Sequence, residues 1–242
     1  MAVYRNDPDL NLLGQCSNEE LQLLVSILTT DPRDGDTRWT EGLTGTPEYR
    51  LLAPDHRRYW QLIVAELQRY GANTLASLVR LGQGVTYREI LVDVCDKLDV
   101  NYNQKSATET IELALLMKVL EKSLDQMTPE ELAAFSRNMH LDLTNPTPQL
   151  ILIAVQAAIR TSSLAALELA TMLSASVITS LGGIATWGTV VVASRALSVL
   201  AGPLAIALSS AWMISDIAGP AYRITIPACI IVAWLRQQHL SR

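Results

Sequence analysis

Residues 17–28 read SNEELQLLVSIL, and this stretch by itself indicates a helical protein. Ser17 and Glu20 have the spacing of a capping box, in which two side chains bind free backbone N–H groups at the start of a helix. The apolar residues of 21–28 then recur at the spacing of one helix face. A polar cap followed by this period predicts an amphipathic helix that begins near Asn18.

The same start signals recur through the first 143 residues, and no run has the alternation that predicts a strand. Three further capping boxes pair Thr86 with Glu89, Ser106 with Glu109, and Thr128 with Glu131. Gly71 is expected to end a helix over residues 55–70, a short helix is expected over 74–81, and residues 31–53 are expected to form a long loop. The predicted helix starts lie near Pro8, Asn18, His56, Tyr87, Ala107 and Pro129.

Charge divides the chain into two unlike halves. The 242 residues carry a net charge of −5, which argues against nonspecific nucleic-acid binding. Residues 1–149 contain 14 basic and 22 acidic residues, whereas residues 150–242 contain 5 and 2. We therefore predict an all-α protein with a soluble, acidic, multi-helix domain over 1–145, a proline-containing linker over 146–149, and a hydrophobic helical domain over 150–242.

The hydrophobic half is expected to form a helical bundle or hairpin. Glycines and prolines cut it into pieces near 183–201, 203–218 and 220–240. Its small-residue composition suits membrane helices and tight soluble bundles alike, so membrane association and a soluble core both stay open. Arg195 and Asp216 are the charges of residues 169–218. In a bilayer they mark function, and in a soluble bundle they lie at helix ends or pair with each other.

Catalytic and metal-binding patterns are not found in the sequence, which predicts a non-enzymatic protein without cofactor or metal. The three cysteines, Cys16, Cys95 and Cys229, are distant and odd in number, so we expect buried thiols in a reducing compartment. The polar N-terminus lacks the pattern of a signal peptide. We therefore expect a cytoplasmic protein.

The densest polar and aromatic cluster runs from His56 through Arg57 and Arg58 to Trp60. It suits a surface for an acidic partner, a phosphate or a lipid head group. The alternative is a helix first turn in which Tyr59 or Trp60 faces the core while the arginines pair with nearby Glu or Asp residues. Tyr222 with Arg223 is a second candidate, because an aromatic residue beside arginine suits a membrane interface, and its alternative is a helix start after Gly219-Pro220.

Four blocks of the chain resemble the YaaW family of enterobacterial proteins. They are Asp7-Pro8-Asp9-Leu10, residues 56–68, residues 87–94 and residues 221–228. The resemblance spans nearly the whole chain and is most specific over 56–68. Through that family it implies a middle region similar to ubiquinol–cytochrome c chaperones, which assist the assembly of a respiratory membrane complex. It implies no catalytic residues.

These observations lead to a functional hypothesis. We expect a membrane-associated chaperone or assembly-type factor that binds a membrane protein, held in the cytoplasm at the inner membrane. A membrane-active, pore-forming effector is the first alternative, and a soluble helical interaction protein is the second. The expected partners are a membrane protein or the lipid bilayer, with no nucleic acid, and self-association stays open.

Overall fold

The computed structural model describes residues 2–31, 36–74, 84–180 and 221–241. In these ranges the chain forms helices and one isolated bridge between Thr30 and Thr37, and no strand. The elements, of which η1 and η2 are 3-10 helices, are η1 (Pro8–Gln15), α1 (Asn18–Thr29), α2 (Pro47–Leu52), η2 (His56–Tyr59), α3 (Trp60–Thr74), α4 (Tyr87–Lys97), α5 (Thr108–Leu124), α6 (Pro129–Asn138), α7 (Pro148–Thr161), α8 (Ser163–Ser180) and α11 (Tyr222–Leu240). The predicted all-α class is confirmed for this part of the chain.

Capping boxes start three helices where the sequence predicts them. Helices α1, α4 and α6 each have a Ser or Thr N-cap and a glutamate at the third helical position that bind reciprocally. At α1, for example, the backbone N–H of Ser17 donates to Oε2 of Glu20 over 2.7 Å. Each box satisfies N–H groups that have no partner inside the helix, so these starts are fixed by local sequence.

Asp7 serves two helix starts at once. Its Oδ1 accepts from the backbone N–H of Asp9 in η1, and its Oδ2 accepts from that of Tyr87, the first residue of α4. The second bond is 2.6 Å long and joins residues 80 positions apart. The carboxylate, 1% exposed, therefore fixes η1 against the start of α4.

Two predicted boundaries are wrong. Gly71 does not end its helix, because α3 continues to Thr74. A Cβ atom at Gly71 would lie 2.3 Å from Cγ1 of Ile90, so glycine serves the close approach of α3 to α4 instead of a cap. The expected loop over 31–53 also contains α2, whose N-cap Thr46 and first residue Pro47 are a start signal that the prediction missed.

The start of α5 is also displaced from the prediction. The N-cap is Ala107, without a side-chain hydrogen bond, and not Ser106. Glu109 then falls at the second helical position, so the expected capping box does not form. The predicted helix over 74–81 lies outside the described residues, apart from Thr74 at the end of α3.

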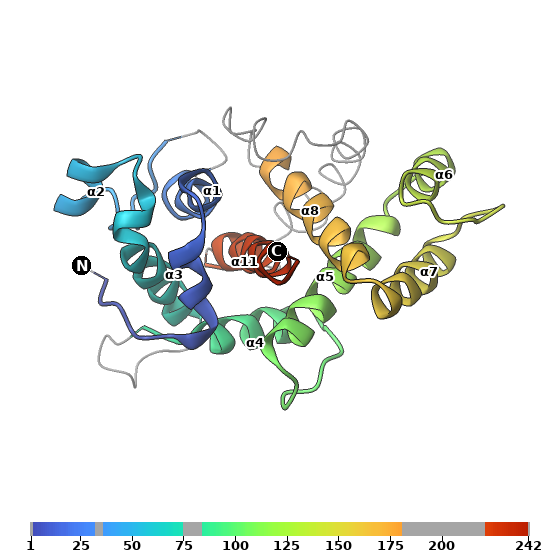
Figure 1. The fold of residues 1–242 in the computed structure, drawn as a ribbon, viewed down its shortest axis with the longest axis horizontal. Coiled ribbons are helices and arrows are strands. Elements are labelled where there is room, and N and C mark those ends of the chain that lie inside the picture. Colours follow the sequence, from blue (N-terminus) through green and yellow to red (C-terminus); the bar gives the residue numbers. More distant parts are fainter. Residues whose placement is uncertain (1, 32–35, 75–83, 181–220, 242) are drawn as a thin grey trace.

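Helix α11 lies in the middle of the molecule. It contacts α8, α1, α5, α3, α4 and η1, and Figure 1 places it between α1 and α3 on one side and α5 and α8 on the other. Its residues from Ile224 to Leu235 are all buried. The buried side chain of Trp234 donates from Nε1 to Oγ1 of Thr171 in α8 over 3.1 Å. The core therefore forms around the last described helix.

Packing across the predicted 146–149 boundary is extensive. Thr147 and Pro148 act as the N-cap and first residue of α7, and α7 packs against α5 of the N-terminal half. One hydrophobic cluster includes residues from both halves. The division into separate domains stays a prediction. Among the described helices, none is long and apolar enough to cross a membrane, so a hydrophobic span in the C-terminal half is not supported by them.

Candidate functional site

The cluster predicted as a binding surface is split into a buried and an exposed part. His56 is 1% exposed, and its Nε2 lies 2.7 Å from Oε1 of Gln22 while its Nδ1 lies 2.5 Å from the hydroxyl of Tyr59. Burial lowers the pKa of His56, although Asp55 and Glu19 act in the opposite direction. His56 is thus a packed side chain between α1 and η2 and not part of the surface.

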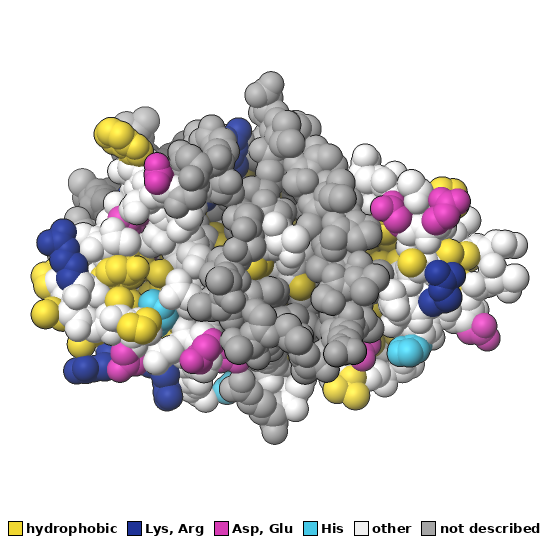
Figure 2. Space-filling view, turned by 90° about the horizontal axis from the view of Figure 1, so that it is seen from above, with side chains coloured by type: hydrophobic (Ala, Val, Ile, Leu, Met, Phe, Trp, Pro, Cys, Tyr) yellow, Lys and Arg dark blue, Asp and Glu magenta, His cyan; other side chains and the backbone are white. Residues whose placement is uncertain are grey.

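Arg57 and Arg58 are exposed, as is Arg50 on α2. None of the three side chains pairs with an acid in the described ranges. Glu48 and Asp55 belong to the same segment, and Figure 2 shows basic and acidic side chains close together at the end of the molecule where α2 lies. The two predicted arginines stay available for an acidic group, but on a surface of mixed sign.

Trp60, the last member of that cluster, packs against the N-terminal segment. Its ring meets the ring of Tyr4 edge to face, with centroids 6.0 Å apart. A Cβ atom at Gly14 would lie 3.1 Å from the indole, so η1 also lies close against it. These contacts give Trp60 a structural role.

The second predicted pair begins α11. The hydroxyl of Tyr222 donates to Oδ1 of Asp93 over 3.2 Å, and Nζ of Lys97 lies 5.5 Å above its ring. Burial, with Asp93 nearby, raises the pKa of Tyr222 to about 12. The buried Nε of Arg223 and Oδ2 of Asp93 have no hydrogen-bond partner within the described residues. Tyr222 therefore fixes the start of α11 against α4.

The remaining candidates lie outside the described residues. These are Arg195 and Asp216, together with the segments 183–201 and 203–218. Their roles as charges in a membrane segment stay predictions.

A buried polar cluster, called here the Glu112 joint, forms around Glu112 of α5, whose side chain has no exposed surface. Its Oε1 accepts from the hydroxyl of Tyr87 in α4, and its Oε2 accepts from Nε of Arg236 in α11, each over 2.7 Å. Arg236 also donates from Nη2 to the carbonyl of Asp9 in η1 over 2.7 Å. One carboxylate thus connects α4, α5, α11 and η1.

Burial dominates the electrostatics of this joint. It raises the pKa of Glu112 from its usual 4.5 to about 7, although the Arg236 guanidinium and the Tyr87 hydroxyl favour the ionised carboxylate. Burial also raises the pKa of Tyr87 well above its usual 10. Both side chains are fully buried, so a dissolved substrate does not reach them. The arrangement holds helices together.

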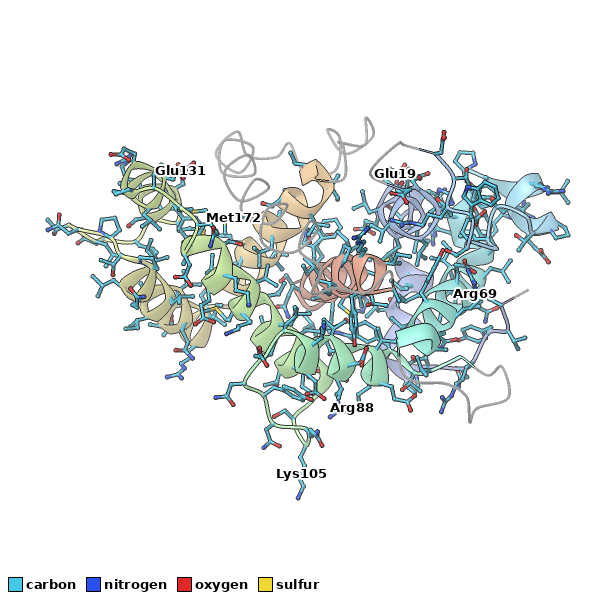
Figure 3. All side chains as sticks on the ribbon, turned by 180° about the vertical axis from the view of Figure 1, so that it is seen from behind. Glu19, Arg69, Arg88, Lys105, Glu131 and Met172 are labelled. Carbon is cyan, nitrogen blue, oxygen red and sulfur yellow. The ribbon has the colours of Figure 1, made fainter. Side chains whose placement is uncertain are left out.

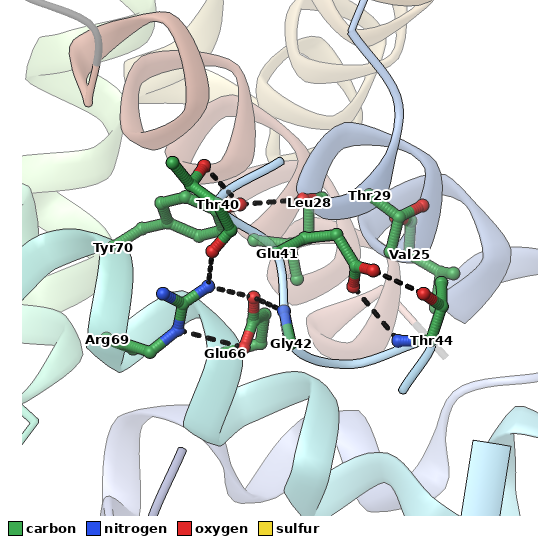
Figure 4. A network of polar contacts seen from close by, with 10 residues as sticks. All are labelled: Val25, Leu28, Thr29, Thr40, Glu41, Gly42, Thr44, Glu66, Arg69 and Tyr70. Carbon is green, nitrogen blue, oxygen red and sulfur yellow. Dashed lines mark hydrogen bonds and ion pairs between the residues drawn. The ribbon is translucent and has the colours of Figure 1, made fainter. Parts of the chain in front are cut away.

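A second buried acid, Glu66, organises the segment before α2, as Figure 4 shows. Its Oε1 accepts from the backbone N–H of Gly42 over 2.9 Å, and its Oε2 accepts from Nε of Arg69 over 3.1 Å. Arg69 in turn donates to the carbonyl of Thr40. Because Glu66 and Arg69 both belong to α3, this network holds residues 40–42 against that helix.

Arg88 of α4 organises the loop between α4 and α5. Figure 3 shows it above the loop that carries Lys105 near its tip. Its guanidinium donates to the carbonyls of Gln104 and Ser106 over 2.6 and 2.7 Å, and to Oγ1 of Thr108 over 3.1 Å. These bonds hold the turn that precedes α5 against α4.

The described surface also contains an open groove between α5 and α7, with a volume of about 580 Å³. Asp99, Val100 and Asn101, which follow α4, also line it. The larger apolar lining residues are Leu113 and Met117 of α5 and Leu152, Ile153 and Ile159 of α7. A groove between two helices with apolar walls suits the binding of a ligand, and it is a candidate site on the described surface.

Four charged side chains line the same groove. Nζ of Lys118 lies 2.8 Å from Oε2 of Glu121, so these two neutralise each other. Asp99 and Arg160 have no partner in the part of the chain that the structure describes. Asp99 has φ 55°, in the left-handed region that Asp tolerates better than most residues, and this turn follows the end of α4. The groove therefore offers apolar walls with one free acid and one free base.

Sequence reasoning missed the groove. A signal was present, because α5 carries Leu113 and Met117 beside its buried stripe of Ile111, Leu115 and Leu116. The extra apolar residues widen the apolar face beyond what one neighbouring helix covers. Among the described residues, no group of three or more His, Cys, Asp or Glu side chains gathers closely enough to hold a metal ion.

Comparisons with known proteins give relatives along almost the full chain. A UPF0174 protein of Helicobacter pylori strain J99 is 41% identical over 97% of this chain and 92% of its own. The UPF0174 protein YaaW of Escherichia coli K12 is 30% identical over 97% of this chain and 95% of its own. A family model described as a domain of unknown function, DUF3944, matches residues 4–39, which contain η1 and α1. No solved structure matches the chain.

Proposed function

We propose, from the premise that the chain belongs to the UPF0174 family, that it is a non-enzymatic assembly-type factor. In this proposal the groove between α5 and α7 binds an amphipathic helix of a client membrane protein. The observation that carries the proposal is the groove itself, with apolar walls from two helices. The implied likeness to ubiquinol–cytochrome c chaperones, which motivated an assembly role, stays part of the proposal.

The dimensions of the groove favour a helix as the ligand. Its α5 wall runs from Thr110 to Glu121, which at ~1.5 Å per residue is about 18 Å or three turns. Helix-in-groove recognition uses apolar anchors at the spacing of successive turns. Met117 lies in the middle of this wall, and its flexible, polarisable side chain adapts to different apolar partners.

The buried titratable groups support binding over catalysis. Glu112, Tyr87 and Cys229 have no exposed surface, so their unusual pKa values are consequences of packing. Burial likewise raises the pKa of the Cys95 thiol to about 12, which makes it a poor nucleophile. The accessible groove carries apolar and oppositely charged side chains, which suit recognition of a peptide.

The test uses a synthetic amphipathic helix as a probe. A fluorescent peptide of about 18 residues, with leucines on one face, is titrated with the full chain and followed by anisotropy. A peptide of the same composition in scrambled order is the ligand control. We expect Leu113→Glu and Met117→Glu to weaken binding about tenfold, because each places a charge in the apolar wall.

Leu51→Glu is the matched protein control, since Leu51 is 81% exposed but lies on α2, away from the groove. It should leave peptide binding unchanged. Equal binding of the scrambled peptide, or full binding by both groove variants, would exclude the groove as a helix receptor.

The alternatives differ from this proposal in defined ways. A soluble helical interaction protein would use the same groove for a client that is not a membrane protein. The pore-forming alternative rests on residues 183–218, which lie outside the described part of the chain. The groove therefore supports a binding protein over a pore. Whether the bound client is a membrane protein or a soluble protein distinguishes the assembly factor from the soluble interaction protein.

A further inference from the structure

We propose that the outer face of α7, with the start of α8, lies on the surface of an anionic lipid bilayer. This inference deepens the proposed function, on which it rests for the source of the client helix. Leu150, Ile153 and Leu164 supply the apolar contact, and Arg160 supplies the positive charge.

Exposure identifies this face. Leu150, Ile153 and Leu164 are 45%, 63% and 62% exposed. Seven large hydrophobic side chains are exposed in the described chain, and three of them fall in this stretch of 15 residues. Leu150 and Ile153 are about one turn apart on α7, and Leu164 lies in the first turn of α8. Single exposed aliphatic residues are ordinary on a protein surface, whereas a concentration of them in one segment is typical of an interaction site.

The opposite face of α7 is anchored in the protein. Ile151 and Val155 are buried, and α7 packs against α5 and α8. On a helix, residues 150, 153 and 157 lie on the side away from residues 151 and 155. Helix α7 therefore has one apolar face toward the core and a second apolar strip toward the exterior, as expected for a helix between a protein and another apolar medium.

Charge selects a lipid surface as the occupant of this second face. From Leu143 to Leu167 the chain has no acidic residue, and Arg160 is its one charged residue. Residues 1–149, in contrast, contain 22 acids against 14 bases. An anionic membrane repels most of such a protein, and the acid-free stretch is the part that approaches it with the least repulsion, although Asp99 and Glu121 line the adjoining groove.

The chemistry of the contact fits an interfacial helix. Such helices insert an aliphatic strip at the boundary of head groups and acyl chains, while arginine extends its charge to the phosphates. Arg160 has no partner among the described residues, so its guanidinium is free for this role. Gln149, Gln156 and Thr161 flank the strip with uncharged polar groups that tolerate the head-group region.

The location of the face gives the proposal its functional consequence. Ile153 lines the α5–α7 groove and also belongs to the exposed strip. A bilayer against this strip thus brings one wall of the groove to the membrane surface. A helix that emerges from the membrane would reach the groove without crossing bulk water.

The experiment is flotation of the full chain with vesicles of phosphatidylcholine, with and without about 30% phosphatidylglycerol. We expect binding to the anionic vesicles. The double variant Leu150→Glu with Leu164→Glu should reduce that binding at least about tenfold, because both charges enter the contact region. Arg160→Glu should remove the preference for the anionic vesicles. Leu51→Glu is the control at an exposed leucine of α2, outside the proposed contact, and should bind as the native chain does.

Neither Leu150 nor Leu164 lines the groove, whereas Leu113 and Met117 line it without belonging to the exposed strip. The experiments therefore distinguish a failure of the groove proposal from a failure of the lipid proposal. Met117→Glu should bind the helical peptide more weakly and still bind the vesicles. The Leu150→Glu, Leu164→Glu variant should bind the vesicles more weakly and still bind the peptide. A bimane label on Ile153→Cys gives a second measurement in an otherwise native surface, and its emission should shift to the blue with vesicles.

Three results would overturn the lipid assignment. They are no flotation of the native chain, equal flotation of the Leu150→Glu, Leu164→Glu variant, or an unshifted bimane emission at position 153. A change from dimer to monomer in that double variant, without lipid, would instead assign the face to a second copy of the chain.

Discussion

Helices α7 and α11 come from the same weakly charged half of the chain, and they have opposite environments. Helix α11 contacts α8, α1, α5, α3, α4 and η1, and its residues from Ile224 to Leu235 are buried. Helix α7 packs mainly against α5 and α8, and two of its large aliphatic residues are exposed. Apolar composition therefore does not distinguish a core helix from a helix that faces outward, since the number of neighbouring elements decides between them.

The largest effect should come from the centre of α11. Trp234→Ala removes a fully buried indole and its hydrogen bond to Thr171, and we expect a loss of about 3–5 kcal/mol in the free energy of unfolding. The matched change on the outer face of α7, Ile153→Ala, should stay within about 0.5 kcal/mol. Chemical denaturation of the two variants measures both values. Similar losses would contradict the contrast between the helices.

A second test removes the buried ion pair between Glu112 and Arg236, which holds α11 against α5. Glu112→Ala leaves Arg236 without its buried anion, so a loss of about 3–5 kcal/mol is expected. Glu112→Leu together with Arg236→Met replaces the pair by apolar groups and should recover much of that loss. Denaturation of the single and double variants decides the matter. If the double variant is no more stable than Glu112→Ala, the two side chains stabilise the fold by more than neutralising each other's buried charge.

The pH dependence of stability should isolate the same joint. Because the folded pKa of Glu112 is about 7 and its usual value is 4.5, the folded state holds a proton that the unfolded state releases between these values. The contribution of this group to stability is therefore present below pH 4.5 and is lost as the pH rises through 7. Glu112→Gln should lack this component. Parallel stability profiles of the native chain and the variant across that range would show that the carboxyl group does not bind this proton.

The smallest effect is expected at the start of α7. Thr147 accepts from the backbone N–H of Leu150 over 3.3 Å, and Thr147→Ala should cost about 1 kcal/mol through the lost cap. Thr147→Ser keeps the hydroxyl and should be close to the native value. Thermal unfolding compares the two. A loss equal to that of Trp234→Ala would mean that α7 is a core element after all.

The sequence predicted the features that depend on a few neighbouring residues. Helix starts at Asn18, Tyr87 and Pro129 follow from capping boxes, and a box needs only four consecutive residues. The three cysteines are buried, as expected. The family relationship is also confirmed, by relatives that are 41% and 30% identical over 97% of this chain. It was recognisable because each of the blocks that carry it is a contiguous run of residues.

Features that depend on distant residues were not predicted. Gly71 lies inside a helix at a point where Ile90 of another helix leaves no room for a side chain. His56 is buried because Gln22, 34 positions away, binds its ring. The groove requires the relative placement of α5 and α7, and the period within either helix does not contain that information. Arg57 and Arg58, whose exposure follows from their own polarity, are the part of the predicted surface that remains accessible.

The bond from Arg236 to the carbonyl of Asp9 joins residues 227 positions apart. During synthesis the ribosome releases η1 and α1 long before α11, which follows every other described element in the chain. Until then the apolar faces of α1, α3, α4 and α5 lack the helix on which they pack. Contacts of such long range slow folding and prolong the exposure of nascent apolar surface. Completion of this fold therefore comes after synthesis of α11, and nascent chains stalled before residue 222 should be sensitive to protease throughout their N-terminal helices.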